Sequence, residues 1–170
     1  MNIYLDMDDV VADWLTSAQD FLKMRWNAAA ERIPQKDWDR LKNESRFYRN
    51  LPVKPGAHEL VAWCQEYIER NSTPEKPIGL YFLSAIPHDY SMPYATSDKV
   101  NWAAEHFPEV PVFIGPFSFD KYRHCQSPND VLIDDRHSNC HEWIAAGGKA
   151  HIYTSWENCH TWLEATLGTL

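Results

Sequence analysis

The chain has 170 residues, of which 44% are hydrophobic and 24% charged, and its formal net charge is −8. This length allows one core with a small inserted subdomain, and the composition is that of an ordinary globular protein. The negative charge argues against a protein that binds long nucleic acids, because clustered Lys and Arg bind phosphate backbones. No apolar run is long enough to span a membrane and the chain begins directly with a strand, so we expect neither a signal peptide nor a membrane segment.

The cysteines predict reduced thiols. The chain has four of them and no C-x-x-C pair, at Cys64, Cys125, Cys140 and Cys159. A chain of this size does not need disulfides, so we expect a cytoplasmic protein. The sequence does not determine its oligomeric state and leaves a homodimer open.

The most informative stretch is residues 3–14, which read IYLDMDDVVADW. Its apolar run stops at an acidic cluster, which is typical of a buried parallel strand whose carboxyl end opens into a site. Asp6 and Asp8 are two residues apart and face the same side if the chain stays extended. Two converging carboxylates are tolerable if a cation lies between them or if they share a proton. Oxygen ligands of this kind favour Mg²⁺.

The interval between Trp14 and Pro77 is expected to be helical, without a strand. Apolar spacing predicts a first helix that runs to about Asn27, followed by helices at 37–43 and 57–70. The inward positions of the first helix are Val10, Trp14, Ala18, Phe21 and Leu22. We assign residues 14–76 to a small helical cap with its return helix, and residues 1–13 and 77–170 to an α/β core.

The second half of the chain alternates strands with helices. Strands are predicted at 78–84, 110–114, 131–135 and 150–153, and helices at 94–107, 138–146 and 156–167. Alternation of this kind predicts an α/β fold with a doubly wound parallel sheet, Rossmann-like in arrangement. For helix 94–107 we expect Val100, Ala103, Ala104 and Phe107 to face inward.

Polar residues end three of the predicted strands: Asp6 and Asp8, then Ser84, then Asp134 and Asp135. In a parallel sheet these ends lie along one edge. Lys121, in a predicted loop thirteen residues before Asp134, can reach the same edge. Phosphoryl transfer needs such a set: carboxylates for a cation and for attack, a hydroxyl, and an ammonium.

These motifs resemble those of the haloacid dehalogenase superfamily of phosphotransferases. Asp6-Met7-Asp8-Asp9-Val10 is similar to its first motif, Leu83-Ser84 to its second, Lys121 to its third and Asp134-Asp135 to its fourth. Within the superfamily the chain resembles the 5′(3′)-deoxyribonucleotidases, through residues 5–14, 47–52, 55–57, 120–121 and 132–136. The likeness spans nearly the whole chain and implies a helical cap inserted after the first strand. One position departs from the family, which usually has glycine where Asp9 stands.

The resemblance implies a role for each matched residue. Asp6 would be the nucleophile that forms an aspartyl-phosphate. Asp8 would protonate the leaving oxygen and then take a proton from water, which requires the two carboxylates to titrate apart. Ser84 and the N–H of Ala85 would hold phosphate oxygens, and Lys121 would neutralise the phosphoryl group.

The resemblance also implies a magnesium site. Its ligands would be the Asp6 side chain, the Asp8 backbone carbonyl and Asp134, with Asp135 acting through water. Arg136 and Asn139 either brace the loop after the fourth strand or form an exposed helix start.

Several residues are candidates for substrate contact. Trp14, Phe47 and Tyr48 could stack on a base, although helical aromatic residues are more often core. Phe21 is assigned to the core. Lys99 is expected to be solvated or to contact the substrate.

We therefore predict a Mg²⁺-dependent phosphatase of nucleotide metabolism that acts on small deoxyribonucleoside monophosphates. One alternative is a phosphatase of the same superfamily for another small phosphomonoester, such as a sugar phosphate, or for a nucleic-acid 3′-phosphate. Another is a receiver-like phosphorylation switch, which also uses paired aspartates, a hydroxyl, a lysine and Mg²⁺. The helical insert after the first acidic pair, where a lid belongs, disfavours the switch.

Overall fold

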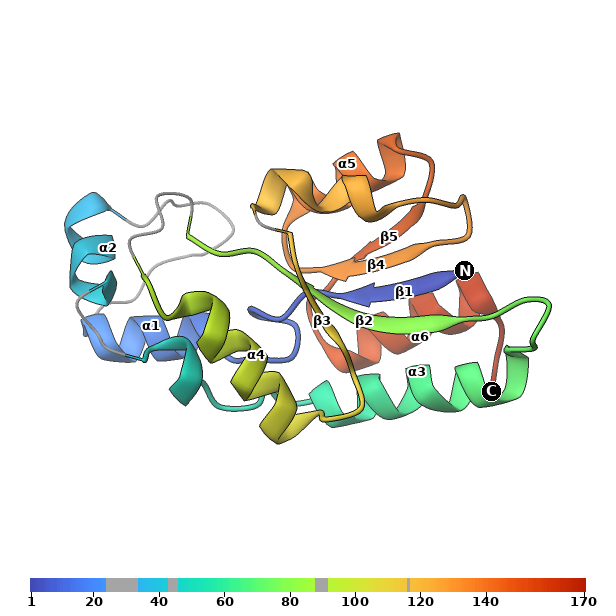
Figure 1. Ribbon diagram of the computed structural model, residues 1–170, viewed down its shortest axis with the longest axis horizontal. Coiled ribbons are helices and arrows are strands. Elements are labelled where there is room, and N and C mark those ends of the chain that lie inside the picture. Colours follow the sequence, from blue (N-terminus) through green and yellow to red (C-terminus); the bar gives the residue numbers. More distant parts are fainter. Residues whose placement is uncertain (24–33, 43–45, 88–91, 116) are drawn as a thin grey trace.

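The computed structural model describes residues 1–23, 34–42, 46–87, 92–115 and 117–170 (Figure 1). Its sheet has five strands, which are β1 (Asn2–Leu5), β2 (Gly79–Ser84), β3 (Val112–Ile114), β4 (Val131–Asp134) and β5 (Lys149–Ile152). Their order is β3-β2-β1-β4-β5, and every neighbouring pair is parallel. The predicted parallel α/β sheet is confirmed.

β1 lies in the middle of the sheet, because it pairs with β2 on one side and with β4 on the other. Leu5 is in register with both Phe82 and Ile133. The strand order reverses at β1, and ligands of open α/β sheets bind beyond the carboxyl ends of the strands at such a reversal. The chain leaves β1 there at Asp6.

Helices cover both faces of the sheet, as a doubly wound fold requires (Figure 1). α3 (Ala57–Asn71) and α6 (Trp156–Leu167) pack together on one face, and α5 (His137–Ala145) lies on the other. Successive residues of a strand point to opposite faces. Accordingly, Ile3 and Leu5 belong to the larger core cluster, whereas Tyr4 packs in a smaller one with Leu83, Leu132 and Trp143.

α1 (Trp14–Leu22), α2 (Gln35–Lys42) and the short 3₁₀ helix η1 (Tyr48–Asn50) follow β1 in the sequence. α1 and α2 lie at the end of the molecule away from both termini (Figure 1). Within the described residues no strand occurs between Trp14 and Pro77, as predicted. Together with η1, these helices precede α3, which returns the chain to the sheet.

The first helix is shorter than predicted. It begins at Trp14 rather than near Val10, because the N–H groups of Val10, Val11 and Ala12 all donate to the carbonyl of Met7 in a tight turn. It ends at Leu22, since Lys23 is left-handed with φ 58° and its N–H donates to Asp20. The predicted continuation to Asn27 lies outside the described residues.

Two further expectations about side chains are wrong. Phe21, assigned to the core, is 37% exposed. In α4 (Ala95–His106) Val100 is 42% exposed and Ala104 is also exposed. The buried face of α4 consists of Ala95, Asp98, Lys99, Trp102 and Ala103. The prediction failed because it took Lys99 as solvent-facing, whereas Lys99 and Asp98 are both buried with partners.

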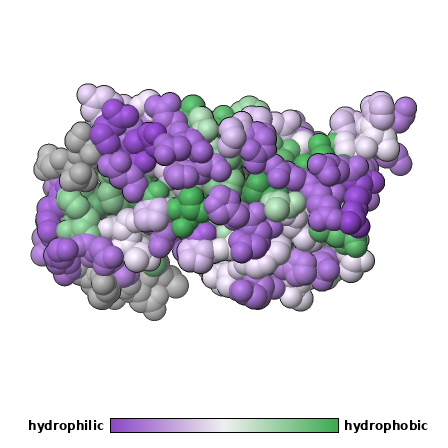
Figure 2. All heavy atoms as spheres, turned by 90° about the horizontal axis from the view of Figure 1, so that it is seen from below, coloured by the Kyte–Doolittle hydropathy of each residue, from purple (hydrophilic) through white to green (hydrophobic). Residues whose placement is uncertain are grey.

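The outer surface matches the composition. The face shown in Figure 2 is mostly hydrophilic, with small hydrophobic areas between the polar side chains. Across the part of the chain that the structure describes, none of the helices has the length and apolar character that crossing a membrane requires.

Candidate active site

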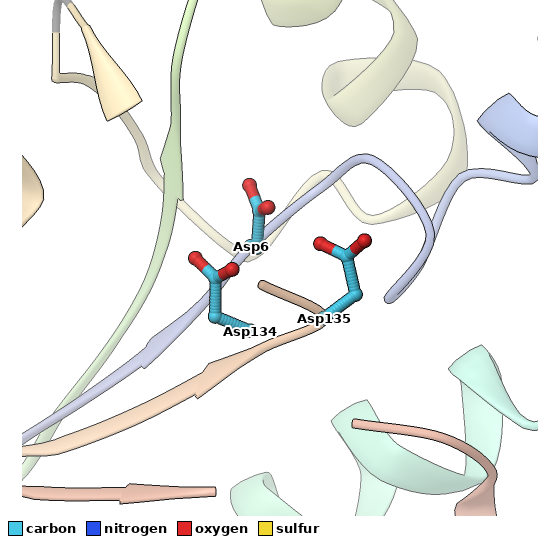
Figure 3. A group of neighbouring side chains, drawn as sticks. All are labelled: Asp6, Asp134 and Asp135. Atoms are coloured by element: carbon cyan, nitrogen blue, oxygen red, sulfur yellow. The ribbon is translucent and has the colours of Figure 1, made fainter. Parts of the chain in front are cut away.

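Three carboxylates meet at the carboxyl ends of β1 and β4. One oxygen from each of Asp6, Asp134 and Asp135 lies within 4.8 Å of the others. Figure 3 shows the side chains rising from the two neighbouring strands toward the same side. Asp6 and Asp134 are buried, and Asp135 is half-buried. The structure therefore brings Asp6 of the first motif together with both acidic residues of the fourth motif.

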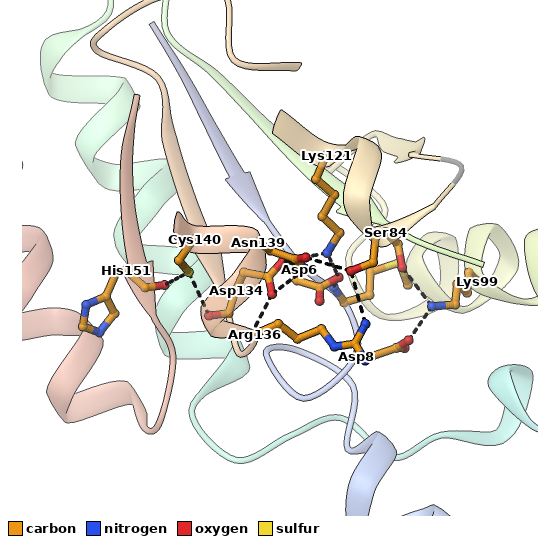
Figure 4. A network of polar contacts seen from close by, with 12 residues as sticks. Asp6, Asp8, Ser84, Lys99, Lys121, Asp134, Arg136, Asn139, Cys140 and His151 are labelled. Carbon is orange, nitrogen blue, oxygen red and sulfur yellow. Dashed lines mark hydrogen bonds and ion pairs between the residues drawn. The ribbon is translucent and has the colours of Figure 1, made fainter. Parts of the chain in front are cut away.

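Lys121 lies against two of these carboxylates. Its Nζ is 2.7 Å from Asp6 Oδ1 and 2.7 Å from Asp134 Oδ2, and the side chain is buried (Figure 4). Burial lowers the pKa of Lys121, but the two carboxylates outweigh burial and raise it above its usual range. The ammonium therefore stays charged. It lies on η2 (Ser118–His124), a 3₁₀ helix, so the prediction of a loop there was wrong.

The pKa values of the carboxyl groups indicate excess negative charge. Burial raises the pKa of Asp6 to about 7, with Lys121 opposing and Asp134 and Asp8 adding to the shift. Burial and the charges of Asp6 and Asp134 raise the pKa of Asp135 to about 8. A divalent cation among the three carboxylates would offset this repulsion, and their oxygens are ligands that Mg²⁺ prefers. The residues present therefore fit a magnesium ion.

Asp134 is held in place by the start of α5. The amide of Asn139 donates to both carboxylate oxygens, at 3.0 and 2.9 Å, and the Arg136 N–H donates to Oδ1 at 2.9 Å. The hydroxyl of Ser118 donates in turn to the Asn139 side-chain oxygen at 2.8 Å. Asn139 is buried. Of the two interpretations left open, bracing of the loop after β4 is the one observed.

Asp8 lies outside the group of three carboxylates and contacts Lys99 instead. The Lys99 ammonium donates to Asp8 Oδ2 at 2.6 Å and to Ser84 Oγ at 2.9 Å (Figure 4). Ser84 ends β2 and is fully buried, and Ala85 follows it directly. Lys99 is 1% exposed, so the expectation that it is solvated is wrong.

Asp9, which stands where the resembled family usually has glycine, adopts a left-handed backbone with φ 60°. Glycine adopts this conformation without strain, and aspartate tolerates it better than most residues. The Asp9 carboxylate accepts the N–H of Leu15 in the first turn of α1 at 3.0 Å and lies 3.5 Å from Lys54. The loop therefore keeps its turn and gains a helix-capping contact.

The three candidate base-contact residues form one aromatic cluster. Ring centroids are 6.1 Å apart for Trp14 and Phe47 and 5.7 Å apart for Phe47 and Tyr48. Trp38 lies 5.8 Å from Trp14 on the other side. Phe47 and Tyr48 are 7% and 4% exposed, whereas Trp14 is half-buried. Trp14 thus presents the most accessible ring of the three predicted residues.

The burial of Lys99 was not predicted from the sequence. For Asn139 the sequence left two interpretations open, bracing of the loop after β4 and an exposed helix start. A signal for Lys99 existed, because it lies four residues after Ala95 and three before Trp102, on a stripe that small and aromatic residues share. The sequence holds no comparable signal for Asn139, because the packing of α5 against β4 determines which residue it contacts.

The sequence was compared with known protein families and structures. It matches, over residues 1–166, the family described as "5′ nucleotidase, deoxy (Pyrimidine), cytosolic type C protein". The chain belongs to this 5′-nucleotidase family. The resemblance to the haloacid dehalogenase superfamily and its deoxyribonucleotidases is thereby confirmed, and the protein is a phosphoric monoester hydrolase.

Solved structures of low sequence identity align with nearly the whole of this nucleotidase family member. A hydrolase from Pseudomonas syringae aligns with a TM-score of 0.52 at 9% identity, covering 97% of this chain and 99% of its own. A hydrolase from Streptococcus pneumoniae TIGR4 gives 0.49 at 16% identity, covering 96% and 97%. A HAD family hydrolase from Deinococcus radiodurans R1, solved with bound phosphate and sodium, gives 0.48 at 12% identity, covering 98% and 96%. Among curated proteins, none matches the sequence significantly.

Proposed function

We propose that the protein hydrolyses deoxyribonucleoside 5′(3′)-monophosphates, with Mg²⁺ and through an aspartyl-phosphate on Asp6. The observation that carries this proposal is the convergence of Asp6, Asp134, Asp135 and Lys121 at the reversal of strand order. Membership of the 5′-nucleotidase family supports the substrate class.

In the first half-reaction an Asp6 carboxylate oxygen attacks phosphorus, and the bond from phosphorus to the 5′ or 3′ oxygen breaks. Asp8 gives its proton to that leaving oxygen. The Ser84 hydroxyl and the Ala85 N–H orient the phosphate oxygens. Lys121, 2.7 Å from Asp6, neutralises charge on the nucleophile and on the phosphoryl group.

In the second half-reaction water attacks the phosphorus of the aspartyl-phosphate. Asp8 takes the proton of that water, inorganic phosphate leaves, and Asp6 returns to the carboxylate form. The same side chain thus acts as acid and then as base.

The proposed ligands of Mg²⁺ are Asp6, the Asp8 backbone carbonyl and Asp134, with Asp135 acting through water. The bound ion supplies positive charge that offsets the phosphoryl oxygens. Asn139 and the Arg136 N–H hold the Asp134 carboxylate in one orientation for this role.

We propose that residues 14–76 form the cap, with its return helix, and that residues 1–13 and 77–170 form the core. The aromatic cluster of the cap supports base recognition, with Trp14 offering the accessible ring and Phe47 and Tyr48 packed beside it. Four free cysteines support a cytoplasmic location.

The test is a phosphate-release screen over deoxyribonucleoside and ribonucleoside monophosphates and sugar phosphates, with Mg²⁺ or with EDTA. We expect deoxyribonucleotides to react fastest and EDTA to stop the reaction. Asp6→Asn should reduce release to the background of the assay. A wide preference for sugar phosphates would show that the substrate assignment is wrong, and full activity of Asp6→Asn would remove the proposed nucleophile.

A further inference from the structure

Lys99 is a buried ammonium with a complete set of partners. It is 1% exposed, and its Nζ contacts Asp8 Oδ2 at 2.6 Å and Ser84 Oγ at 2.9 Å (Figure 4). The Nζ also lies over the face of the Tyr48 ring, 4.4 Å from the ring centroid. A buried charge is costly unless it is paired and hydrogen-bonded. Two hydrogen-bond acceptors and a ring face meet that condition, so the side chain is held in one place.

The contact with Ser84 determines what the serine hydroxyl can do. An ammonium has three donors and no acceptor, so Ser84 Oγ must accept from Lys99. The hydroxyl proton of Ser84 then points elsewhere and is available to a phosphate oxygen. Because of Lys99, the Ser84 hydroxyl can therefore act as a hydrogen-bond donor to the phosphate that it is proposed to bind.

The contact with Asp8 fixes the carboxyl group in a similar way. It engages Oδ2, which leaves Oδ1 to exchange a proton with the leaving oxygen and with water. The Asp8 side chain is 30% exposed. Without Lys99 the Asp8 carboxyl group would be free to rotate toward solvent. Its Oδ1 would then no longer be held toward the leaving oxygen.

α4 is fixed against the segment that carries Tyr48. Arg46 Nη2 lies 2.6 Å from Asp98 Oδ1, and the Trp102 indole N–H donates to the Leu51 carbonyl at 2.7 Å. These contacts flank Lys99 on the same buried face of α4. The helix therefore presents the ammonium from a rigid support.

We propose that Lys99 is a positioning residue that aims the Asp8 carboxyl group and the Ser84 hydroxyl. It acts through these two side chains, in contrast to Lys121, which lies at the nucleophile. The proposal rests on the proposed function, because it assumes that Asp8 transfers the proton of the leaving group. It replaces the interpretation of Lys99 as a substrate contact.

The experiment compares two substrates that differ in their need for an acid. A deoxyribonucleoside 5′-monophosphate releases an alkoxide and needs protonation, whereas p-nitrophenyl phosphate releases a stable phenolate and does not. General acid catalysis contributes about 10²- to 10⁴-fold. For Lys99→Met we expect kcat on the nucleotide to fall about 100-fold, and kcat on p-nitrophenyl phosphate by less than about tenfold.

A weaker Ser84 contact should raise KM for both substrates alike, by less than about tenfold. At saturating nucleotide, kcat of the double variant Asp8→Asn/Lys99→Met should be no lower than kcat of Asp8→Asn alone, because both changes lower kcat by removing the same proton transfer. Lys99→Arg, which keeps the charge, should recover part of the nucleotide rate. Lys149→Met, at the start of β5, is the matched control and should leave both rates unchanged.

Two results overturn the positioning role. One is an equal fall in kcat on both substrates, and the other is additive loss in the double variant. Circular dichroism checks folding, and if Lys99→Met does not fold, Lys99→Gln takes its place. A ratio of the two rates in Lys99→Gln equal to that of the wild type overturns the role. Wild-type protein that hydrolyses neither substrate overturns the proposed function and this inference with it.

Discussion

Asp8 and Asp6 come from one short loop and yet have different surroundings. Asp6 is buried beside Lys121 and Asp134, whereas the Asp8 side chain is partly exposed and paired with Lys99. Burial raises the pKa of Asp6 to about 7, so its role as an ionised nucleophile needs a cation beside it that offsets this shift. The separate roles proposed for Asp6 and Asp8 therefore depend on the surroundings of each side chain.

Asp8→Asn tests that division. The amide keeps the size of the carboxyl group but cannot transfer a proton to the leaving oxygen. We expect kcat on a deoxyribonucleotide to fall by about 10²- to 10⁴-fold. The thermal unfolding temperature should fall as well, because the buried Lys99 ammonium loses its charged partner. Steady-state kinetics and calorimetry measure the two quantities, and a fall of less than tenfold would argue that Asp8 is not the acid.

Asp9 combines an unfavourable backbone with a favourable side-chain contact. The left-handed conformation costs about 1–2 kcal/mol for a residue with a Cβ, and the hydrogen bond to the Leu15 N–H returns about 1 kcal/mol. Asp9→Gly removes both effects and should change the free energy of unfolding by less than about 1 kcal/mol. Asp9→Ala loses the hydrogen bond and keeps the strain that the wild type already has, so it should cost about 1 kcal/mol. Denaturant unfolding of the wild type and both variants measures these differences, and an Asp9→Ala variant as stable as the wild type would contradict the capping role.

At the scale of elements, α4 is the support that joins the segment around η1 to the site. Its buried face holds Asp98, Lys99 and Trp102 at helical spacing, and each has a partner from another part of the chain. Glu105, one turn further on, pairs with Arg49. A helix held at several successive turns fixes the direction of each side chain that it presents.

Trp102→Phe tests this support. The change leaves the buried Leu51 carbonyl without the indole N–H, and an unsatisfied buried acceptor costs about 1–3 kcal/mol. Trp63→Phe is the matched control, because its buried indole N–H has no partner among the residues that the structure describes. Both changes remove similar volume, so denaturant unfolding should show a larger loss for Trp102→Phe. A larger loss for Trp63→Phe would mean that packing, and not the hydrogen bond, dominates.

At the scale of the whole molecule, the topology assembles the site. The parallel sheet reverses its strand order at β1, and the residues after β1, β2 and β4 meet there. The cost is a concentration of buried carboxylates whose charges oppose folding. Stability of the whole protein should therefore depend on pH and on divalent cations.

The pH dependence follows from the raised pKa values of Asp6, about 7, and Asp135, about 8. Below these values the folded protein keeps protons that the unfolded chain has already lost, so stability falls as pH rises toward 8. Burial lowers the pKa values of His124 and His151, which acts in the opposite sense but only below their ordinary value of 6.5. In EDTA we expect the unfolding temperature to fall between pH 6.5 and 8 by at least about 2–4 °C, or about 1 kcal/mol.

Magnesium should reverse this fall. At a concentration of about 100 times Kd, a cation that binds only the folded state adds about 2.7 kcal/mol. The gain should be larger at pH 8 than at pH 6.5, because the ligands must be deprotonated. Asp135→Asn should flatten the pH dependence in EDTA. An unfolding temperature that rises toward pH 8 in EDTA would contradict the charge repulsion inferred for Asp6 and Asp135.

Local sequence patterns predict the alternation of strands and helices, the parallel sheet and the acidic residues at the ends of two strands. These features depend on local periodicity and on where an apolar run stops, so they are visible in a single chain. Helix and strand limits were close to those observed, except in the first helix, where the turn after Met7 and the left-handed Lys23 set the ends.

Which polar side chains have partners depends on contacts between elements that are far apart in the sequence. The Lys99 ammonium donates to Asp8, 91 positions away, and the Asn139 amide donates to both carboxylate oxygens of Asp134. Sequence periodicity treats a charged residue in a helix as solvated, because it carries no information about the neighbours that other elements supply. Burial of charge is favourable only where such neighbours are present. The spacing of Lys99 with Ala95 and Trp102 therefore indicates a buried position, but its partners Asp8 and Ser84 are known only from the assembled fold.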